Sequence, residues 1–236
     1  MSVPLSRRLC ACAALVPSGA RVADVGTDHG YLGIYLLREG LCPYVAACDL
    51  REGPLENARR NADRFGIRQG MDFILSDGLH KVCPDSIDAV VCAGMGGDLI
   101  IKILSEAPWL KNGCYTLILQ PQAGINELRA WLGAQGYREE QAALVRDAGF
   151  LYCAMQVRFT GEKTELSPGQ QFLSPALLSS RSPLLGDYMT QLRATMEKII
   201  SGLSRAGSGA DPGRLSYFLA ALQELKETEA QYGNSQ

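Results

Sequence analysis

The chain has 236 residues, of which 47% are hydrophobic and 20% are charged, and its formal net charge is −2. This composition supports a folded core and excludes a disordered chain. The near-neutral charge excludes nucleic-acid binding through overall positive charge, so any such surface must be a local patch.

The N-terminal stretch carries Arg7 and Arg8, followed by apolar residues through Val16. A signal peptide is one interpretation, but the apolar run is short and cleavage after it would cut at the edge of the first core strand. We therefore expect an amphipathic opening helix that covers the sheet. Apolar runs elsewhere stay below the roughly 18 residues that cross a bilayer, so we expect a cytoplasmic protein without a membrane partner.

Strand and helix patterns then alternate through about residue 160. Strands are predicted at residues 21–25, 44–48, 73–75, 87–93 and 115–119. Helices are predicted at residues 31–38, 54–68, 99–104 and 125–135. This alternation predicts an α/β fold with a parallel sheet.

Two extended runs follow, at residues 140–145 and 150–159, with a short link that can join only antiparallel strands. A mostly parallel sheet that closes with an antiparallel hairpin is typical of class I methyltransferases, which have a Rossmann-like sheet. A nicotinamide-dependent oxidoreductase would instead keep its last strand parallel. We expect residues 1–160 to form this domain.

Residues 160–183 are rich in Ser, Pro, Gly and Gln, which predicts a linker or an irregular crossing. Apolar residues then recur at coiled-coil spacing from Leu185 to Leu203, and a second stripe runs from Leu215 to Leu225 after a Gly/Ser/Pro turn at 205–213. Residues 161–236 are therefore expected to form a linker and a C-terminal helical hairpin. The hairpin could stabilise the fold or clamp a substrate, and both roles stay open.

The loop after the first strand contains Asp24, Gly26, Asp28 and Gly30. The two glycines let the backbone approach a ligand closely. Asp28 stands where a dinucleotide-binding loop has a glycine, and its carboxylate would repel a pyrophosphate. A cationic ligand fits better, and S-adenosylmethionine, with its sulfonium and ammonium groups, is such a ligand. We expect Asp24 to hold the ammonium.

The neighbouring loop residues divide between ligand contact and support. Thr27 is expected to face the methionine part with Gly26 and Asp28, while His29 fits a structural hydrogen bond better than a general base. At the end of the second strand, Asp49 stands 23 residues after Gly26 and is expected to bind both ribose hydroxyls.

Other strand ends add candidate cofactor contacts. Leu50 follows Asp49, and Asp77 before Gly78 is placed to accept a hydrogen bond from the adenine amino group. Each acid alone could be a helix cap or a turn former. Acids at three strand ends favour a shared site, because these ends meet at one edge of a parallel sheet.

The fourth and fifth strand ends are expected to face the acceptor. Gly94, Met95 and Gly96 form a glycine-rich turn whose bare backbone suits a flat ligand and the cofactor. Gln120, before Pro121, could hydrogen-bond the edge of a heterocycle. The candidate catalytic residues are Asp28, Gly94 and Gln120.

These motifs together resemble the bacterial tRNA (adenine-22-N1)-methyltransferase family. The resemblance is carried by the opening residues 5–9, the loop at 24–32, the turn at 94–97 and residues 117–121, and it extends through the trailing hairpin. It implies a class I cofactor domain, S-adenosylmethionine as methyl donor, and adenine N1 of tRNA as acceptor. The chain departs from the family at Gln122, where Asn is usual, and at Gly30, where Ala or a similar small residue is usual.

Methylation of adenine N1 needs alignment of the base with the methyl group more than it needs proton removal, because the unmethylated nitrogen already carries a lone pair. Asp28 is the candidate for stabilising the positive charge that develops on the base. Phosphate contacts are expected mainly on the first helix of the hairpin. The candidate basic side chains are Arg7, Arg8, Arg59, Arg60, Arg64, Arg68, Arg181, Arg193, Lys198, Arg205 and Arg214.

Two other functions stay open: a methyltransferase of a small molecule or a protein, and a non-catalytic module that binds cofactor and RNA.

The chain carries eight scattered cysteines, and four stand in or near apolar, strand-like runs: Cys48, Cys92, Cys114 and Cys153. We interpret them as free, buried thiols in a reducing compartment. Cys10-x-Cys12 lacks a second pair, so no metal is expected. No obligate protein partner is indicated, and we expect a monomer.

Overall fold

The computed structural model describes residues 2–205 and 211–233 and contains a seven-stranded sheet in the order β3-β2-β1-β4-β5-β7-β6. The strands are β1 Val22–Val25, β2 Val45–Asp49, β3 Met71–Leu75, β4 Ala89–Gly96, β5 Thr116–Ala123, β6 Tyr137–Asp147 and β7 Phe150–Phe159. The first five strands pair in parallel, and β7 is antiparallel to both β5 and β6. This confirms the predicted fold class and its antiparallel ending.

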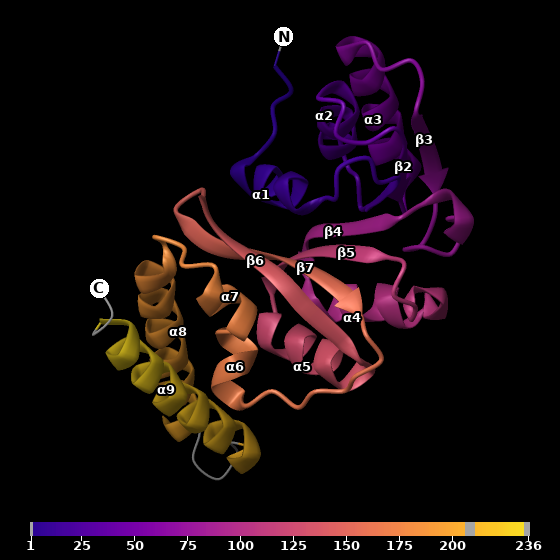
Figure 1. The fold of residues 1–236 in the computed structure, drawn as a ribbon. Helices are drawn as coiled ribbons and strands as arrows, with labels where there is room; N and C mark the ends of the chain where they lie inside the picture. Colours follow the sequence, from indigo (N-terminus) through magenta and orange to yellow (C-terminus); the bar gives the residue numbers. More distant parts are fainter. Residues whose placement is uncertain (1, 206–210, 234–236) are drawn as a thin grey trace.

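Helices cover both faces of the sheet (Figure 1). They are α1 Arg7–Leu15, α2 Tyr31–Arg38, α3 Glu52–Phe65, α4 Gly97–Ser105, α5 Ile125–Gln135, α6 Pro168–Phe172, α7 Pro175–Ser179, α8 Leu185–Arg205 and α9 Pro212–Gly233, with 3-10 turns at Pro84–Ser86 and Pro108–Leu110. Alternate strand residues face opposite sides: Val22 and Val91 pack with α1 and α2, whereas Ala23 and Cys92 pack with α4 and α5. Since both faces are covered, the central strands are apolar throughout.

The segment predicted as an irregular linker contains two short helices. Ser167 caps α6 and Ser174 caps α7, and Pro168 and Pro175 each stand in the first turn. Ser followed by Pro is as good a helix start as it is a loop signal. Composition alone did not separate the two, and the prediction of an irregular crossing is corrected here.

The C-terminal helices form the expected hairpin and share an apolar cluster with the end of the sheet. Leu151 and Cys153 of β7 pack with Leu177 of α7, Leu192 of α8 and Phe218 of α9. The predicted turn at 205–213 falls mostly on residues 206–210, which lie outside the described residues. The helical hairpin therefore packs directly onto the last two strands.

A buried ion pair joins α5 to this region. The Arg129 side chain is 1% exposed; its Nε and Nη2 donate to the Glu139 carboxylate at 2.8 and 3.1 Å. Its Nη1 donates to the carbonyl of Phe172, the last residue of α6, at 2.6 Å. Because one guanidinium satisfies both a carboxylate and a helix end, it ties α5, β6 and α6 together.

All eight cysteines are free, as expected. Five are buried, but Cys10, Cys83 and Cys114 are exposed. Cys114 therefore departs from the prediction of a buried thiol, because β5 starts only at Thr116, after it. Among the described residues, we find no helix with the length and hydropathy needed to span a membrane.

Candidate active site

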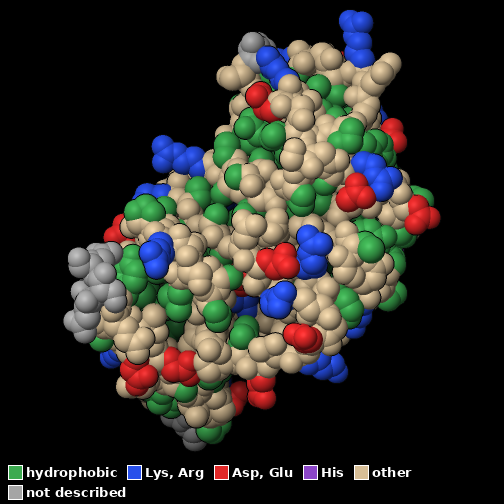
Figure 2. All heavy atoms as spheres, in the orientation of Figure 1, with side chains coloured by type: hydrophobic (Ala, Val, Ile, Leu, Met, Phe, Trp, Pro, Cys, Tyr) green, Lys and Arg blue, Asp and Glu red, His purple; other side chains and the backbone are tan. Residues whose placement is uncertain are grey.

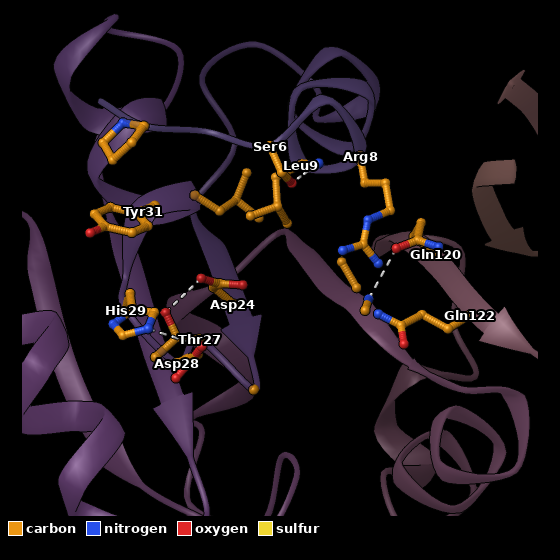
Figure 3. A pocket seen from close by; sticks show the side chains of 15 residues that line it. Ser6, Arg8, Leu9, Asp24, Thr27, Asp28, His29, Tyr31, Gln120 and Gln122 are labelled. Carbon is orange, nitrogen blue, oxygen red and sulfur yellow. Dashed lines mark hydrogen bonds and ion pairs between the residues drawn. The ribbon is translucent and has the colours of Figure 1, made fainter. Parts of the chain in front are cut away.

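A cavity of about 310 Å³ opens at the carboxyl ends of β1, β4 and β5, beneath the start of α1 (Figure 3). It is lined by Pro4, Ser6, Arg8, Leu9, Asp24, Gly26, Thr27, Asp28, His29, Tyr31, Leu32, Ala93, Gly94, Gln120 and Gln122. One wall carries the acids and Thr27 of the β1 loop, and the other carries Arg8 with the two glutamines. The cavity lies where open α/β sheets bind ligands.

The β1 loop is held by its neighbours in a conformation that few sequences adopt. Gly26, Asp28 and Gly30 have φ angles of +74°, +51° and +71°. The amides of Gly26 and Thr27 both donate to the carbonyl of Cys48, at 2.9 Å each. A Cβ on Gly30 would lie 2.9 Å from the Cβ of Ala58 in α3, so in this chain a larger residue there would displace α3. Asp28 is the one non-glycine residue of the three, and aspartate enters this region more readily than most side chains.

Asp24 is a buried acid that faces the cavity. Its side chain accepts a hydrogen bond from Thr27 Oγ1 at 2.7 Å, and the residue is 5% exposed. Burial raises the pKa of Asp24 to about 6, the Thr27 hydrogen bond opposes the rise, and the charge of Asp49 adds to it. A cationic ligand in the cavity would favour the ionised form.

Asp49 supports the same loop from β2. One carboxylate oxygen accepts from the Asp28 amide at 3.3 Å, and the other accepts from the Arg51 amide at 3.0 Å. Asp49 is buried, and Leu50 beside it is 64% exposed. An exposed leucine of this size offers an apolar surface against which a flat ring could lie.

The predicted cofactor residues fall into two groups. Asp24, Gly26, Thr27, Asp28, His29 and Gly94 line the cavity. Gly30, Asp49, Leu50, Asp77, Gly78, Met95 and Gly96 lie outside its lining. Asp77 is half-exposed, 3.5 Å from the Lys102 ammonium, and Gly78 packs against Ile103. The cavity thus brings together residues predicted for the methionine and acceptor ends, while those predicted for the ribose and the adenine lie outside its lining.

The glycine-rich segment after the fourth strand differs from the predicted turn. β4 continues to Gly96 with register shifts around Met95, and α4 starts at Gly97. Gly94 has a φ of +78° inside this irregular strand end. Met95 Cε closes the space beside Gly26, where an added Cβ would lie 3.2 Å from it. The segment is therefore a bulged strand that presents Gly94 to the cavity.

Gln120 lines the cavity and is also held by contacts within the fold. The residue is 1% exposed; Oε1 accepts from the Gly94 amide at 3.2 Å, and Nε2 donates to the Pro121 carbonyl at 2.9 Å. Its amide thus positions Gly94 from the cavity wall, and its contact with a heterocycle stays a prediction. Gln122, two residues on, lines the cavity.

His29 has the structural surroundings that the sequence favoured. Its Nε2 lies 3.5 Å from Asp28 Oδ2, its ring stacks on Tyr31 at 5.6 Å between centroids, and its carbonyl accepts from Asn61 at 2.9 Å. The imidazole is half-exposed. These contacts hold the loop in place.

The wall formed by the opening residues was missed as part of the site. Arg8 Nε donates to Asp147 Oδ2 at 2.8 Å, and its guanidinium carbon lies 4.8 Å from the centre of the Tyr152 ring. The sequence predicts Arg8 only as a candidate phosphate contact. Its partner lies 139 residues away in the chain, so no local signal could place it here. In the described part of the chain, no cluster of three or more His, Cys, Asp or Glu side chains is suited to a metal ion.

Comparisons with known proteins agree with this geometry. A family model described as a methyltransferase domain matches residues 5–155. The tRNA (adenine(22)-N(1))-methyltransferase of Bacillus subtilis is 32% identical over 97% of this chain and 98% of its own. The crystal structure of the B. subtilis M1A22 tRNA methyltransferase TrmK has a TM-score of 0.83 at 26% identity, covering 96% of this chain and 99% of that one.

A Streptococcus pneumoniae protein, described as a candidate tRNA (m1A22) methyltransferase, was solved in complex with S-adenosyl-L-methionine. It has a TM-score of 0.79 at 28% identity, and the match covers 94% of this chain and 98% of that one. The match to the B. subtilis enzyme extends over almost the full length of both chains, including the region of the C-terminal helices. The chain therefore belongs to the tRNA (adenine(22)-N(1))-methyltransferase family.

Proposed function

We propose that the protein transfers the methyl group of S-adenosylmethionine to N1 of adenine 22 in tRNA. The observation that carries the proposal is the cavity at the carboxyl edge of the sheet, with the buried Asp24 on one wall and Arg8, Gly94 and Gln122 on the other. A full-length relative named for this reaction supports the choice of acceptor.

The donor side is built from the β1 and β2 ends. When bound, S-adenosylmethionine supplies an electrophilic methyl group. Asp24 and Asp28 provide the negative charge that a sulfonium and an ammonium require, and Gly26 leaves the backbone accessible. Asp49 and Leu50 continue this surface towards a ribose and an adenine ring. The carboxylates of Asp24 and Asp28 lie together at this end of the cavity, which fits a cation.

The acceptor side needs no general base, because adenine N1 carries its own lone pair. Gly94 leaves room for a flat ring, and the side chain of Gln120 fixes the position of the Gly94 backbone amide. These residues align the base, and alignment of reacting groups makes a large contribution to the rate of such a transfer. Asp28 stays the candidate for stabilising the positive charge on the methylated base.

The test is methylation of unmodified tRNA transcripts with labelled donor, followed by mapping of the modified nucleotide. We expect label at adenine 22 and none when that nucleotide is replaced by guanine. Asp24→Ala should abolish donor binding in calorimetry, whereas Asp63→Ala, at an exposed position of α3, should leave it unchanged. Donor binding without transfer to any tRNA would favour a non-catalytic module, and transfer to free adenosine would favour a small-molecule enzyme.

We also propose that α8 contacts tRNA phosphates. Figure 2 shows basic and acidic side chains interspersed on the visible face, so no broad basic surface covers it. Several candidate arginines are engaged within the fold: Arg59 pairs with Glu52 at 2.7 Å and Arg193 with Glu229 at 3.2 Å. Lys198 on α8 is therefore a better candidate than either arginine.

Lys198→Ala and Arg205→Ala should weaken tRNA binding and flatten its dependence on salt concentration, because fewer counterions are released. Donor affinity serves as the control and should not change. Unchanged tRNA affinity and salt slope in both variants would show that α8 only stabilises the fold.

A further inference from the structure

The tip of the β6–β7 hairpin projects past the edge of the sheet at which the cavity opens. β7 pairs with β5 from Arg158 to Met155 and then runs five residues further to Phe150, roughly 16 Å at the usual rise of a strand. Since β7 is antiparallel to β5, this extension points towards the carboxyl edge. Figure 1 shows the tip beside α1, near one end of α8.

One face of the hairpin tip points towards α1, which carries Arg8 of the cavity wall. Phe150, Tyr152 and Gln156 alternate with the residues that pack against α7 and α8, so they share the opposite face. Gln156 donates to the carbonyl of Leu15 in α1 at 2.7 Å, and Tyr152 lies under Arg8. Phe150 therefore lies on the same face as the wall that Arg8 contributes.

The tip is held firmly at the position where Phe150 is presented. Asp147, directly opposite Phe150 in the last strand pair, binds Arg8 of the cavity wall at 2.8 Å. Arg146 binds Asp187 of α8 at 2.6 Å. The turn residue Ala148 has a φ of +48°, which an alanine rarely adopts.

Phe150 is nevertheless 62% exposed, whereas the adjacent Leu151, on the other face, is 5% exposed. Phe150 does not line the cavity itself, but its strand partner Asp147 binds Arg8, which does. A base that reacts at N1 must leave its stack, and proteins that open a stack insert apolar side chains between the bases. A phenyl ring stacks on any base, because every base has a π face.

We propose that Phe150 stacks on tRNA at the place that adenine 22 leaves when it enters the cavity. This inference rests on the proposed function and names a positioning residue of the same site. Arg8 links Phe150 to the cavity, since it lines the cavity and fixes the tip of the β6–β7 hairpin through Asp147. The ring acts on the RNA stack and makes no contact with the donor.

The experiment compares Phe150→Ala, Phe150→Trp and the wild type in kcat/KM for tRNA and in the dissociation constant for S-adenosylmethionine. We expect kcat/KM to fall about tenfold or more in Phe150→Ala and to be preserved in Phe150→Trp. Donor affinity and the unfolding temperature should not change. Leu219→Ala, which removes a half-exposed apolar side chain of α9, is the matched control and should behave as the wild type.

A second substrate separates stacking from a structural role. In a transcript with abasic sites on both sides of adenine 22, little stacking is left to replace, so Phe150→Ala and the wild type should react at similar rates. The inference is overturned if Phe150→Ala matches the wild type on intact tRNA. It is also overturned if the defect persists at equal size on the abasic transcript, or if donor affinity falls with it. Failure of the proposed function looks different, because then the wild type itself leaves adenine 22 unmodified.

Discussion

Asp24→Asn should stabilise the free protein while removing its affinity for the donor. The wild-type carboxyl is buried, and its pKa of about 6 compares with an ordinary value of 3.8. This difference corresponds to about 3 kcal/mol of unfolding free energy lost when the group ionises in the folded state. Asparagine keeps an oxygen that can accept from Thr27 and carries no charge to desolvate, so up to about 3 kcal/mol should be recovered at pH 7.

The direction of the pH dependence follows from the linkage between proton binding and folding. The pKa of Asp24 is higher in the folded state, so the folded protein binds the proton more tightly than the unfolded chain. The stability that this provides is complete below pH 3.8 and is lost as the pH rises through about 6. The advantage of the variant should therefore grow from pH 4 to pH 6 and become constant above pH 7.

Urea unfolding of both proteins between pH 4 and pH 8 measures this difference directly. Asp63→Asn, at an exposed position of α3, is the matched control and should follow the wild type. Saturating S-adenosylmethionine should raise the unfolding free energy of the wild type and leave Asp24→Asn nearly unchanged, because only the ligand-binding protein gains from mass action. A stability difference independent of pH, or a wild type more stable than the variant at pH 7, refutes the reasoning.

Two further substitutions test the packing. Gly97→Ala places a Cβ 2.3 Å from the Gly124 carbonyl oxygen, so we expect a loss of about 2 kcal/mol or more in urea unfolding, whereas Gly96→Ala meets no atom within 4 Å and should be tolerated. Equal stability of the two variants would contradict the close approach of α4 to the β5–α5 loop. Arg129→Met leaves the Glu139 carboxylate buried without its partner and should cost about 3–5 kcal/mol, with part of the loss recovered in the double variant that also carries Glu139→Gln; a loss below 1 kcal/mol would show that the pair is dispensable.

Local sequence was sufficient to predict the loop and the strand ends that carry the residues proposed for the donor side. Gly26 and Gly30 indicate a loop with positive φ angles, and Asp24 and Asp49 end apolar runs of strand type. Each of these signals lies within a few residues of the strand that positions it. Parallel pairing then brings the strand ends together, so the shared edge could be predicted without knowing any side-chain contact.

The acceptor side depends on contacts that no local pattern encodes. Gln120 reaches Gly94 because β4 shifts register near Met95, and the sequence showed only a glycine-rich turn there. Arg8 lines the cavity because Asp147 holds it from the far end of the chain. Ser167 and Ser174 start helices because the sheet and the hairpin supply apolar surfaces for them to cover.

The apolar cluster that joins the last two strands to the C-terminal helices has a mechanical consequence. Leu151 and Cys153 contribute to this cluster with one face of β7, while Tyr152 between them supports Arg8 with the other. A displacement of α8 is therefore transmitted through both strands of the β6–β7 hairpin to Arg8 at the rim of the cavity. A tRNA bound to the helical hairpin, as proposed, would exert force on the strands that hold Arg8 at the cavity. Binding of the RNA body and positioning of one base would then be mechanically coupled.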